Sequence, residues 1–235
     1  MNPAKLKTAA LDFLFPPNAR CAVCGRTLLF EENSVCKSCF HKISFLHEPR
    51  CAQCKRGVGE GEALQFSFEC AISLFAYEGA GEDVIADLKF RGNPGAAKPW
   101  GEMLAELVRK QPWAAGLDMA ACVPSDEKKR KERGYNQAEL LSDVISVKCG
   151  IINRKELLAK REGALDQIGL GARERFENAK SAYYAADTRG IAGKTILLVD
   201  DVLTSGATAE ACASVLKEAG AGRVYVATLA STLHS

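Results

Sequence analysis

The fold is decided by the stretch Ile196-Leu197-Leu198-Val199-Asp200-Asp201-Val202-Leu203-Thr204-Ser205-Gly206-Ala207-Thr208. Its first four residues are apolar and are typical of a buried parallel strand. Two adjacent carboxylates follow at the carboxyl end of this strand, and a turn rich in hydroxyls leads into a helix. Ligands of open α/β sheets bind at the carboxyl ends of strands. The stretch therefore predicts both an α/β fold and the place of its ligand site.

The turn after the acid pair has the composition of a phosphate-binding loop. Backbone N–H groups at a helix N-terminus face an anion, and the helix dipole favours negative charge there. The hydroxyls of residues 204–208 add donors, and Gly206 lets the backbone approach a phosphate closely. Asp200 and Asp201 would repel that phosphate, so we expect them to accept hydrogen bonds from sugar hydroxyls or to hold a hydrated divalent cation. The pattern predicts a phosphorylated ribose with Mg²⁺ nearby. The lysine-bearing glycine loop of nucleoside triphosphatases does not occur in the sequence, which disfavours ATP hydrolysis.

Strands and helices alternate on both sides of this stretch. The apolar pattern predicts strands at 72–77, 119–123, 195–199 and 224–229, and helices at 84–88, from Pro99, at 136–150 and at 207–219. Asn136 with Glu139 predicts a capping box, and Gly150 closes that helix. The final strand, helix and strand form a βαβ unit, which implies a parallel sheet with a right-handed crossover. The glycine-containing segment 161–178 is expected to be a long loop. We therefore expect an α/β domain at 71–235 and a small cysteine-rich module at 1–70.

Composition narrows the class of protein. The chain has 235 residues with 31 Lys and Arg against 29 Asp and Glu, so its formal charge is +2. A general polyanion-binding protein needs a stronger bias, so any basic function must be local. No run reaches the roughly 18 apolar residues of a membrane span, so no membrane insertion is expected. The apolar segment 6–15 contains Asp12 and is followed by two prolines, which is unlike a signal peptide. We expect a cytoplasmic protein.

The cysteines predict a structural metal site. The chain has 10 cysteines. Paired Cys-x-x-Cys spacings without a secretion signal favour metal binding over disulfides. Two such pairs close a tetrahedral zinc site with no open position, so this Zn²⁺ is expected to be structural. Its ligands are Cys21, Cys24, Cys36 and Cys39. Three further cysteines, Cys122, Cys149 and Cys212, lie among apolar residues and are expected to be ordinary buried thiols.

A second metal site is left open by the sequence. Cys51 and Cys54 form a third pair, but the fourth pair has Ser67 in place of its first cysteine and retains only Cys70. One alternative is a second zinc completed by His41 or His47. The other alternative is a degenerate site without metal.

These motifs together resemble a known family. The stretch 196–208 is similar to the phosphoribosyl-pyrophosphate (PRPP) loop of type I phosphoribosyltransferases, and with the cysteine module the chain resembles the ComF family almost end to end. ComF proteins are phosphoribosyltransferase-like proteins with an N-terminal double zinc ribbon. The resemblance is carried by Leu14-Phe15-Pro16-Pro17, Tyr77-Glu78-Gly79, Leu88-Lys89-Phe90, Arg133-Gly134-Tyr135-Asn136-Gln137, Gln167-x-x-Leu170, Arg175 and Asn178. This chain departs from the family pattern at Ser67, where the family leads us to expect a cysteine.

The resemblance implies roles for individual residues. Asp200 and Asp201 would bind the ribose hydroxyls of Mg²⁺-PRPP. The pyrophosphate would lie near Ser125, with Arg133 as a further contact, although the basic run 128–133 read alone is a solvated face. The 5′-phosphate would be held by Thr204, Ser205, Gly206, Ala207 and Thr208. The family's flexible loop, which closes over the site, would include Arg161, Gln167 and Arg175. Asp200, Asp201 and Arg133 are thus the expected catalytic residues.

The sequence does not identify the acceptor of the phosphoribosyl group. A hood over the site would come from 77–95, where Tyr77 and Phe90 are expected to pack rather than to stack on a base. Three functions stay open: phosphoribosyl transfer, which we favour; PRPP sensing without turnover; and, as the ComF resemblance implies, handling of single-stranded DNA together with DNA-uptake proteins. The oligomeric state is not predicted.

Overall fold

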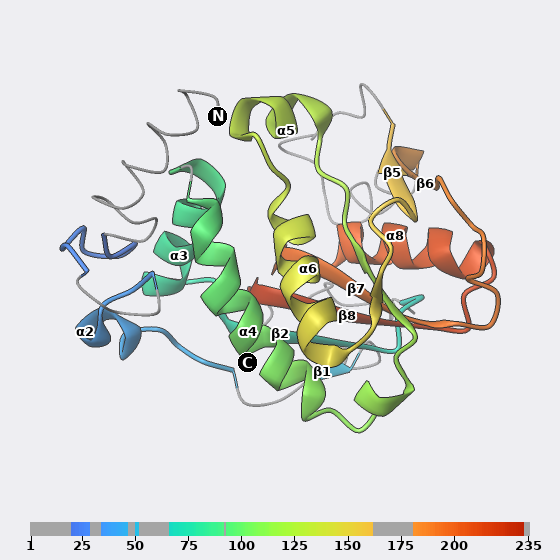
Figure 1. Cartoon of the computed structure of the whole chain (residues 1–235), viewed down its shortest axis with the longest axis horizontal. Coiled ribbons are helices and arrows are strands. Elements are labelled where there is room, and N and C mark those ends of the chain that lie inside the picture. Colours follow the sequence, from blue (N-terminus) through green and yellow to red (C-terminus); the bar gives the residue numbers. More distant parts are fainter. Residues whose placement is uncertain are drawn as a thin grey trace, which may run out of the picture.

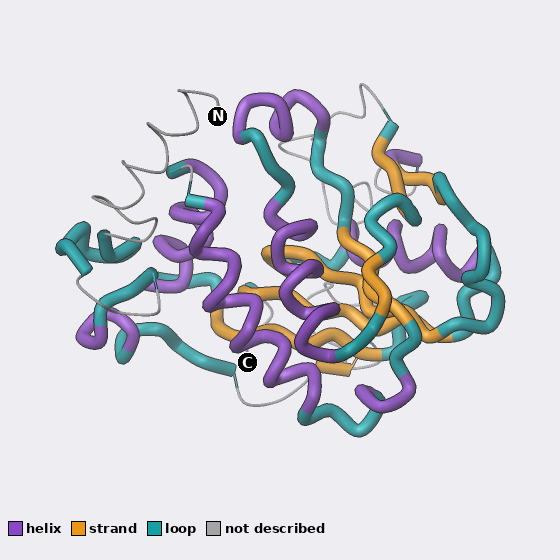
Figure 2. Tube along the Cα trace, viewed as in Figure 1, coloured by secondary structure: helices purple, strands orange, loops and turns teal. Residues whose placement is uncertain are grey.

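A six-stranded sheet forms the centre of the protein (Figures 1 and 2). The computed structural model describes residues 20–28, 34–46, 50–51, 66–91, 93–161 and 181–232. The strands follow one another across the sheet in the order β1 (Arg50–Cys51), β2 (Cys70–Ala76), β8 (Arg223–Ser231), β7 (Thr195–Leu203), β3 (Met119–Cys122) and β4 (Ile152–Asn153). The pairing of β1 with β2 is antiparallel, and the other pairings are parallel. The predicted parallel α/β fold is confirmed.

Helices cover both faces of this sheet. Three helices, α3 (Ala80–Phe90), α4 (Ala97–Arg109) and α6 (Gln137–Cys149), pack on one face, and α8 (Ala207–Glu218) packs on the other. A short helix, α5 (Glu127–Arg133), stands clear of the sheet at the upper edge of Figure 1. The remaining elements among the described residues are α2 (Lys37–Phe40), the 3₁₀ turns η1 (Pro94–Ala96) and η2 (Ala114–Gly116), and a separate antiparallel pair of strands, β5 (Leu158–Lys160) and β6 (Tyr183–Ala185). None of the described helices combines the length and apolar character needed to cross a bilayer.

Burial on both faces explains why β7 is a continuous apolar run. Leu197 and Val199 join the core under α3, α4 and α6, whereas Ile196 and Leu198 join the core under α8. All four side chains are fully buried. Burying each of them stabilises the fold by about 1.5–3 kcal/mol relative to an exposed position. The helix between the parallel strands β7 and β8 makes the βαβ unit that the sequence predicts.

Local signals set most of the helix ends. The Asn136 side chain accepts a hydrogen bond from the Ala138 N–H, and Gly150 ends α6 with φ 68°. This confirms the predicted cap and stop of α6. Helix α4 begins at Ala97, two residues before the predicted start at Pro99. Pro99 is tolerated there because N–H groups of the first turn have no partner within the helix.

The cysteine-rich segment shares its core with the α/β part. The indole N–H of Trp100 donates to Ser34 Oγ over 2.8 Å, and both residues are buried. Phe40 stacks on the same indole with ring centroids 6.3 Å apart, and Phe45 meets Phe75 of β2 edge-on at 6.3 Å. Figure 1 shows this segment, in blue, beside α3 and α4. The two parts are therefore packed together through aromatic side chains.

Candidate functional site

The acid pair lies within β7 rather than after it. The sequence prediction ended this strand at Val199, but β7 continues to Leu203. It does so because β8 runs alongside and pairs Asp200 with Thr228 and Leu203 with Ser231. The prediction followed apolar side chains, whereas backbone hydrogen bonding extends the strand through two charged residues. Since successive side chains of a strand point to opposite faces, the two carboxylates leave on opposite sides of the sheet.

Asp201 faces α3, where it meets a lysine. The Lys89 Nζ lies 2.9 Å from Asp201 Oδ1, and the two side chains are only 22% and 12% exposed. Asp200 is partly buried and accepts a hydrogen bond from the Asp201 N–H through Oδ1, over 2.8 Å. Its charge acts on the buried thiol of Cys212 in α8 and raises the pKa of that thiol beyond the effect of burial. One carboxylate is thus neutralised by a lysine and the other is not.

The electrostatics of Asp200 follow from this arrangement. Burial, and then the charge of Asp201, raise the pKa of Asp200 to about 7, and Lys89 opposes this shift. When Asp200 is ionised, the two carboxylates carry one more negative charge than Lys89 offsets, in a partly buried place. A divalent cation or a set of hydroxyl donors relieves that charge. The acid pair therefore fits both ligands expected from the sequence.

The predicted phosphate loop leads directly into α8. Gly206 occupies the N-cap with φ 82°, and a Cβ at this position would lie 3.2 Å from the ring of Phe66. Any larger residue would be strained and would crowd that ring. The Ala207 N–H donates to Ser205 Oγ over 3.4 Å, and Thr204 is exposed. The turn thus presents hydroxyls and the first N–H groups of a twelve-residue helix.

A serine from the linker to β2 braces this helix. The Ser67 N–H and hydroxyl both donate to the Glu210 carboxylate, over 2.5 and 2.7 Å. Glu210 lies in the first turn of α8 and is 6% exposed. The sequence pattern marks position 67 only as a missing cysteine. In the structure Ser67 instead binds the Glu210 carboxylate, next to the predicted phosphate loop.

The turn after β3 carries the residues expected at the pyrophosphate. Ser125 Oγ is buried and has no hydrogen-bond partner among the described residues. Asp126 accepts hydrogen bonds from the N–H groups of Lys128 and Lys129, over 3.0 and 3.4 Å, and so caps α5. Arg133 ends this helix and donates to Gln137 Oε1 over 3.4 Å. The basic run is therefore a capped helix with no buried residue, a structure that apolar periodicity did not reveal.

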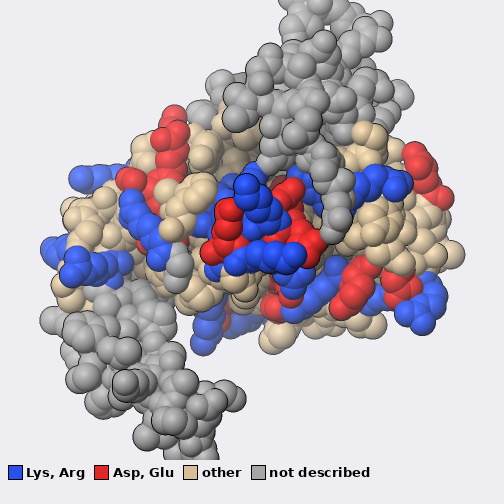
Figure 3. Space-filling view, turned by 90° about the horizontal axis from the view of Figure 1, so that it is seen from above, with Lys and Arg blue, Asp and Glu red and all other residues tan. Residues whose placement is uncertain are grey.

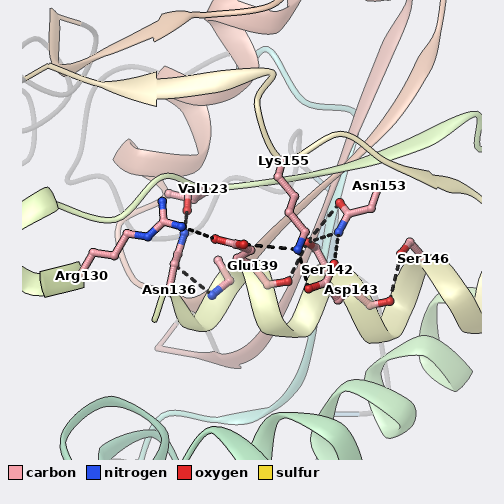
Figure 4. Close-up of polar contacts among 10 residues, drawn as sticks. Val123, Arg130, Asn136, Glu139, Ser142, Asp143, Ser146, Asn153 and Lys155 are labelled. Atoms are coloured by element: carbon pink, nitrogen blue, oxygen red, sulfur yellow. Dashed lines mark hydrogen bonds and ion pairs between the residues drawn. The ribbon is translucent and has the colours of Figure 1, made fainter. Parts of the chain in front are cut away.

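Polar contacts fix the start of α6 against β3 and β4 (Figure 4). Asn136 Nδ2 donates to the Val123 carbonyl over 3.0 Å, so one side chain caps α6 and holds the end of β3. The predicted capping box is incomplete. The Glu139 carboxylate lies 3.3 Å from both Arg130 and Lys155. These ion pairs tie α5 and the segment after β4 to α6 rather than closing the box.

The end of α3 makes contacts in several directions. The Tyr135 hydroxyl donates to the Leu88 carbonyl over 2.8 Å. The Arg133 guanidinium lies 4.9 Å from the Phe90 ring centroid. Arg91 donates to the carbonyl of Ala22 in the cysteine-rich segment. The motif Leu88-Lys89-Phe90 contributed to the family resemblance. It does not predict long-range contacts such as the pair between Lys89 and Asp201.

Charged side chains gather around α5, in the middle of the face seen in Figure 3. A cavity of about 430 Å³ lies there, lined by Asp126, Glu127, Lys128, Lys131, Glu132, Lys160 and Arg161. The Arg161 guanidinium lies 5.1 Å from the Tyr184 ring centroid, and the Lys160 side chain is only 9% exposed. Of the expected flexible-loop residues, Arg161 lies at this cavity, whereas Gln167 and Arg175 are outside the described residues.

Four cysteines form the predicted metal centre. The sulfurs of Cys21, Cys24, Cys36 and Cys39 all lie within 4.8 Å of one another. Cys24 Sγ and Cys36 Sγ are 3.9 Å apart. A tetrahedral zinc with Zn–S bonds of about 2.3 Å places its sulfurs about 3.8 Å apart, so the cluster fits zinc. The Cys39 N–H lowers the pKa of Cys36 to about 6, whereas burial raises that of Cys39 to about 12. A cation at the centre allows all four to be thiolates.

The second cysteine group lies mostly outside the described residues. Cys54 and His47 belong to those outside residues, and only the backbone of Cys51 is described. That backbone pairs Cys51 with Cys70 across β1 and β2. Of the three scattered cysteines, Cys122 and Cys212 are buried and Cys149 is half-buried, and burial raises the pKa of each thiol. This favours the neutral, unreactive form.

The curated relatives include a competence protein and DNA utilization proteins. Competence protein F of Haemophilus influenzae is 33% identical over 109 residues, which cover 46% of this chain and 48% of that protein. The match thus spans about half the length of that relative. The DNA utilization protein YhgH of Salmonella typhi is 27% identical over 193 residues, covering 78% of this chain and 84% of that protein.

Two domain families match the chain in sequence. Residues 10–71 match the double zinc ribbon domain, and residues 132–235 match the phosphoribosyl transferase domain. Among solved structures, a glutamine PRPP amidotransferase from B. subtilis, complexed with ADP and GMP, covers 61% of this chain and 30% of its own, with 17% identity and a TM-score of 0.43. With its zinc ribbon, its phosphoribosyltransferase-like sheet and its competence and DNA-utilization relatives, the chain belongs to the ComF family.

Proposed function

We propose that the chain binds Mg²⁺-PRPP at the carboxyl edge of β7 and transfers the phosphoribosyl group to an acceptor. The observation that carries this proposal is the direct succession of Asp200, Asp201 and the Gly206-capped start of α8. Carboxylates suit ribose hydroxyls, and a helix N-terminus suits a phosphate monoester. The two groups are joined by only the end of β7 and a short turn, which suits a ligand that carries both a ribose and a phosphate.

Each part of PRPP has matching groups in the chain. The amides and hydroxyls of 204–208 bind the 5′-phosphate, and Asp200 and Asp201 accept from the ribose hydroxyls. Ser125, whose buried Oγ has no partner among the described residues, donates to the pyrophosphate. Arg133 lies at the end of the helix that follows and contributes positive charge. Two hydrogen bonds from Ser67 stabilise the Glu210 carboxylate in the first turn of α8.

The chemistry is displacement of pyrophosphate from C1 of the ribose. The C1–O bond to pyrophosphate breaks and its electron pair leaves with pyrophosphate, the sugar acquires oxocarbenium character, and an electron pair of the acceptor forms the new bond to C1. Asp200 and Asp201 are the residues that would hold Mg²⁺, which would supply neutralising charge when bound. Arg133 stabilises the leaving group, and the acid pair orients the ribose and offsets the positive charge on the sugar. The chain provides electrostatic stabilisation and positioning and needs no nucleophilic side chain.

Calorimetry with Mg²⁺-PRPP, run beside a pyrophosphate-release assay, tests this function. The double variant Asp200→Asn, Asp201→Asn is expected to lose PRPP binding. Asp118→Asn is the matched control, because Asp118 pairs with Lys194 and accepts from the Thr195 N–H at the opposite end of β7. Equal PRPP affinity in the double variant and the wild type would overturn the site. PRPP binding without pyrophosphate release for any acceptor would leave a sensor.

A second candidate function is the handling of single-stranded DNA. It is favoured by the cavity beside α5, where four cationic side chains outnumber three acidic ones and Tyr184 lies under Arg161. The cations are Lys128, Lys131, Lys160 and Arg161, and the acids are Asp126, Glu127 and Glu132. Cations beside an exposed aromatic ring are the elements of single-strand binding. Affinity for oligothymidylate should then fall steeply with salt, and Lys128→Ala with Lys131→Ala should flatten that dependence. A flat salt dependence in the wild type would exclude this function.

A further inference from the structure

The end of α3 has no apolar anchor beyond Leu88. Leu88 is fully buried, whereas the side chains of Lys89 and Arg91 are 22% and 50% exposed, and Phe90 is 71% exposed. The prediction that Phe90 packs is therefore wrong, because this residue lies two positions after Leu88 and so about 200° around the helix from the buried stripe. Polar contacts, rather than core packing, set the position of this helix end.

One of these contacts reaches the acid pair. Lys89 Nζ lies 2.9 Å from Asp201 Oδ1, and the Asp201 side chain is 12% exposed. The lysine thus binds an oxygen that a divalent cation at the acid pair would also need. The Lys89–Asp201 ion pair and a bound cation are therefore two alternative states of the proposed site.

Another contact reaches the zinc-binding turn, residues 21–24, which carries the first two metal ligands. Arg91 donates to the carbonyl of Ala22, which follows Cys21 in this turn. Ala22 is 1% exposed, and its N–H donates to the Ser34 carbonyl over 2.9 Å. The four sulfurs of the cluster lie within 4.8 Å of one another, so a bound zinc fixes the turn that presents this carbonyl. The end of α3 is thus bound to the zinc ribbon through Arg91.

Arg91 has alternative partners on its own helix. Its guanidinium nitrogens lie 3.9 Å from Asp83 Oδ1 and 4.0 Å from Asp87 Oδ1, at the long limit of an ion pair. If the zinc-binding turn opens, the guanidinium is free to pair with these carboxylates instead of the Ala22 carbonyl. The end of α3 then loses its contact with the ribbon and samples more positions. This lowers the effective concentration of the Lys89 ammonium at the acid pair.

We propose that zinc in the ribbon regulates the proposed Mg²⁺-PRPP site by keeping Lys89 on Asp201. This inference rests on the proposed function. The zinc-loaded ribbon holds Arg91 and the end of α3, so Lys89 competes well with a divalent cation for the acid pair. Loss of zinc weakens this competition and raises the affinity of the acid pair for the cation. By reciprocity, a cation that displaces Lys89 weakens the binding of zinc in the ribbon.

Binding of Mn²⁺ to the zinc-loaded full chain, measured by electron paramagnetic resonance, tests the route of this coupling. Mn²⁺ takes the same oxygen ligands as Mg²⁺. Lys89→Met should tighten Mn²⁺ binding because the competing cation is gone, and Arg91→Met should tighten it by roughly 5-fold or more. In the double variant the Arg91 change should add nothing, because Arg91 acts through Lys89. Arg109→Met is the matched control, since Arg109 pairs with Glu106 within α4 over 3.1 Å and both side chains are more than half exposed.

Zinc transfer to a chromophoric chelator gives the reciprocal measurement and needs no variant. At constant ionic strength, saturating Mg²⁺ should speed zinc transfer from the wild type by roughly 5-fold or more. Lys89→Met should show no such Mg²⁺ effect, because there is no lysine to displace. Arg109→Met should respond as the wild type does.

The outcomes separate this regulation from the function it rests on. If Lys89→Met binds no Mn²⁺, or if Asp200→Asn with Asp201→Asn leaves Mn²⁺ binding unchanged, the proposed function loses its metal site. If the acid pair binds Mn²⁺ but Arg91→Met and the wild type have equal affinity, the proposed function stands and the regulation is overturned. A full Arg91→Met effect in the Lys89→Met background overturns the route through the lysine. Zinc transfer from the wild type that Mg²⁺ slows or leaves unchanged overturns the coupling itself.

Discussion

The Lys89 ammonium lies 2.9 Å from Oδ1 of Asp201, with both side chains largely buried. A lysine of α3 thus neutralises one half of the acid pair at the end of β7. A divalent cation bound at the same carboxylates, as proposed above, would compete with this lysine for their oxygens. Lys89 keeps the unliganded site from carrying two uncompensated negative charges.

Replacing this lysine should destabilise the unliganded protein. Lys89→Met leaves a buried carboxylate without its cation, so we expect unfolding to become easier by about 1–3 kcal/mol. Added Mg²⁺ should recover more stability in this variant than in the wild type, because the cation no longer displaces a lysine. Thermal unfolding with and without Mg²⁺ measures both effects. The control is Lys194→Met, since Lys194 pairs with Asp118 on the surface at 2.8 Å. Equal Mg²⁺ responses in wild type and Lys89→Met would refute the competition.

Stability should depend on pH through Asp200. Burial and Asp201 raise the pKa of Asp200 to about 7, well above its value in an unfolded chain. The folded state then binds more protons than the unfolded state, so this contribution to stability is present at low pH and is lost as pH rises through about 7. Asp200→Asn carries no such proton, so its Tm advantage over wild type should grow between about pH 5 and about pH 8. Tm curves that stay parallel over that range would contradict the assignment.

Removal of zinc should destabilise the α/β part of the protein as well as the zinc ribbon. Cys36→Ser should lose roughly one zinc per chain and lower the Tm of the α/β part, because Ser34 and Phe40 pack on Trp100. Zinc is measured by elemental analysis, and unfolding of the α/β part by far-ultraviolet circular dichroism. Cys149→Ser, outside the ribbon, should retain the metal. A variant that loses zinc while its sheet melts at the wild-type temperature would show that the two parts fold separately.

Restoring the cysteine pattern at position 67 should not help. Ser67→Cys recreates a Cys-x-x-Cys pair with Cys70, but Ser67 donates twice to Glu210. We expect unchanged zinc content and a loss of about 1–2 kcal/mol in unfolding free energy, because a thiol is a weaker donor to a carboxylate. Ser67→Ala should lose a similar amount and provides the comparison. A gain of zinc in Ser67→Cys would mean that position 67 belongs to the second cysteine group.

The sequence was most informative where burial is two-sided and where caps are local. Strands β7 and β8 are buried on both faces, so their apolar runs were visible, and Asn136 with Gly150 marked the ends of α6 correctly. The cysteine spacing likewise predicted the first metal cluster. Helix α5 was missed as a helix because none of its residues is buried, and apolar periodicity therefore gave no signal.

The candidate site was predictable in its local part only. Residues 200–208 run from the end of β7 into the first turn of α8, and their order alone predicts an acid pair followed by a phosphate-binding loop. The pairs Lys89–Asp201 and Ser67–Glu210 join residues more than a hundred positions apart, so no local spacing encodes them. The exposure of Phe90 depends on what lies around α3, which no property of the residue itself reveals.

The aromatic contacts around Trp100 make the stability of the α/β part depend on zinc binding by the cysteine-rich segment. Trp100 and Phe75 are fully buried, and Phe40 and Phe45 from the ribbon side cover them. A gene truncated to begin at β2 would yield a sheet with a bare aromatic patch, prone to aggregation. In a cell starved of zinc, the same patch would open in the intact chain, and proteases would clear both halves together.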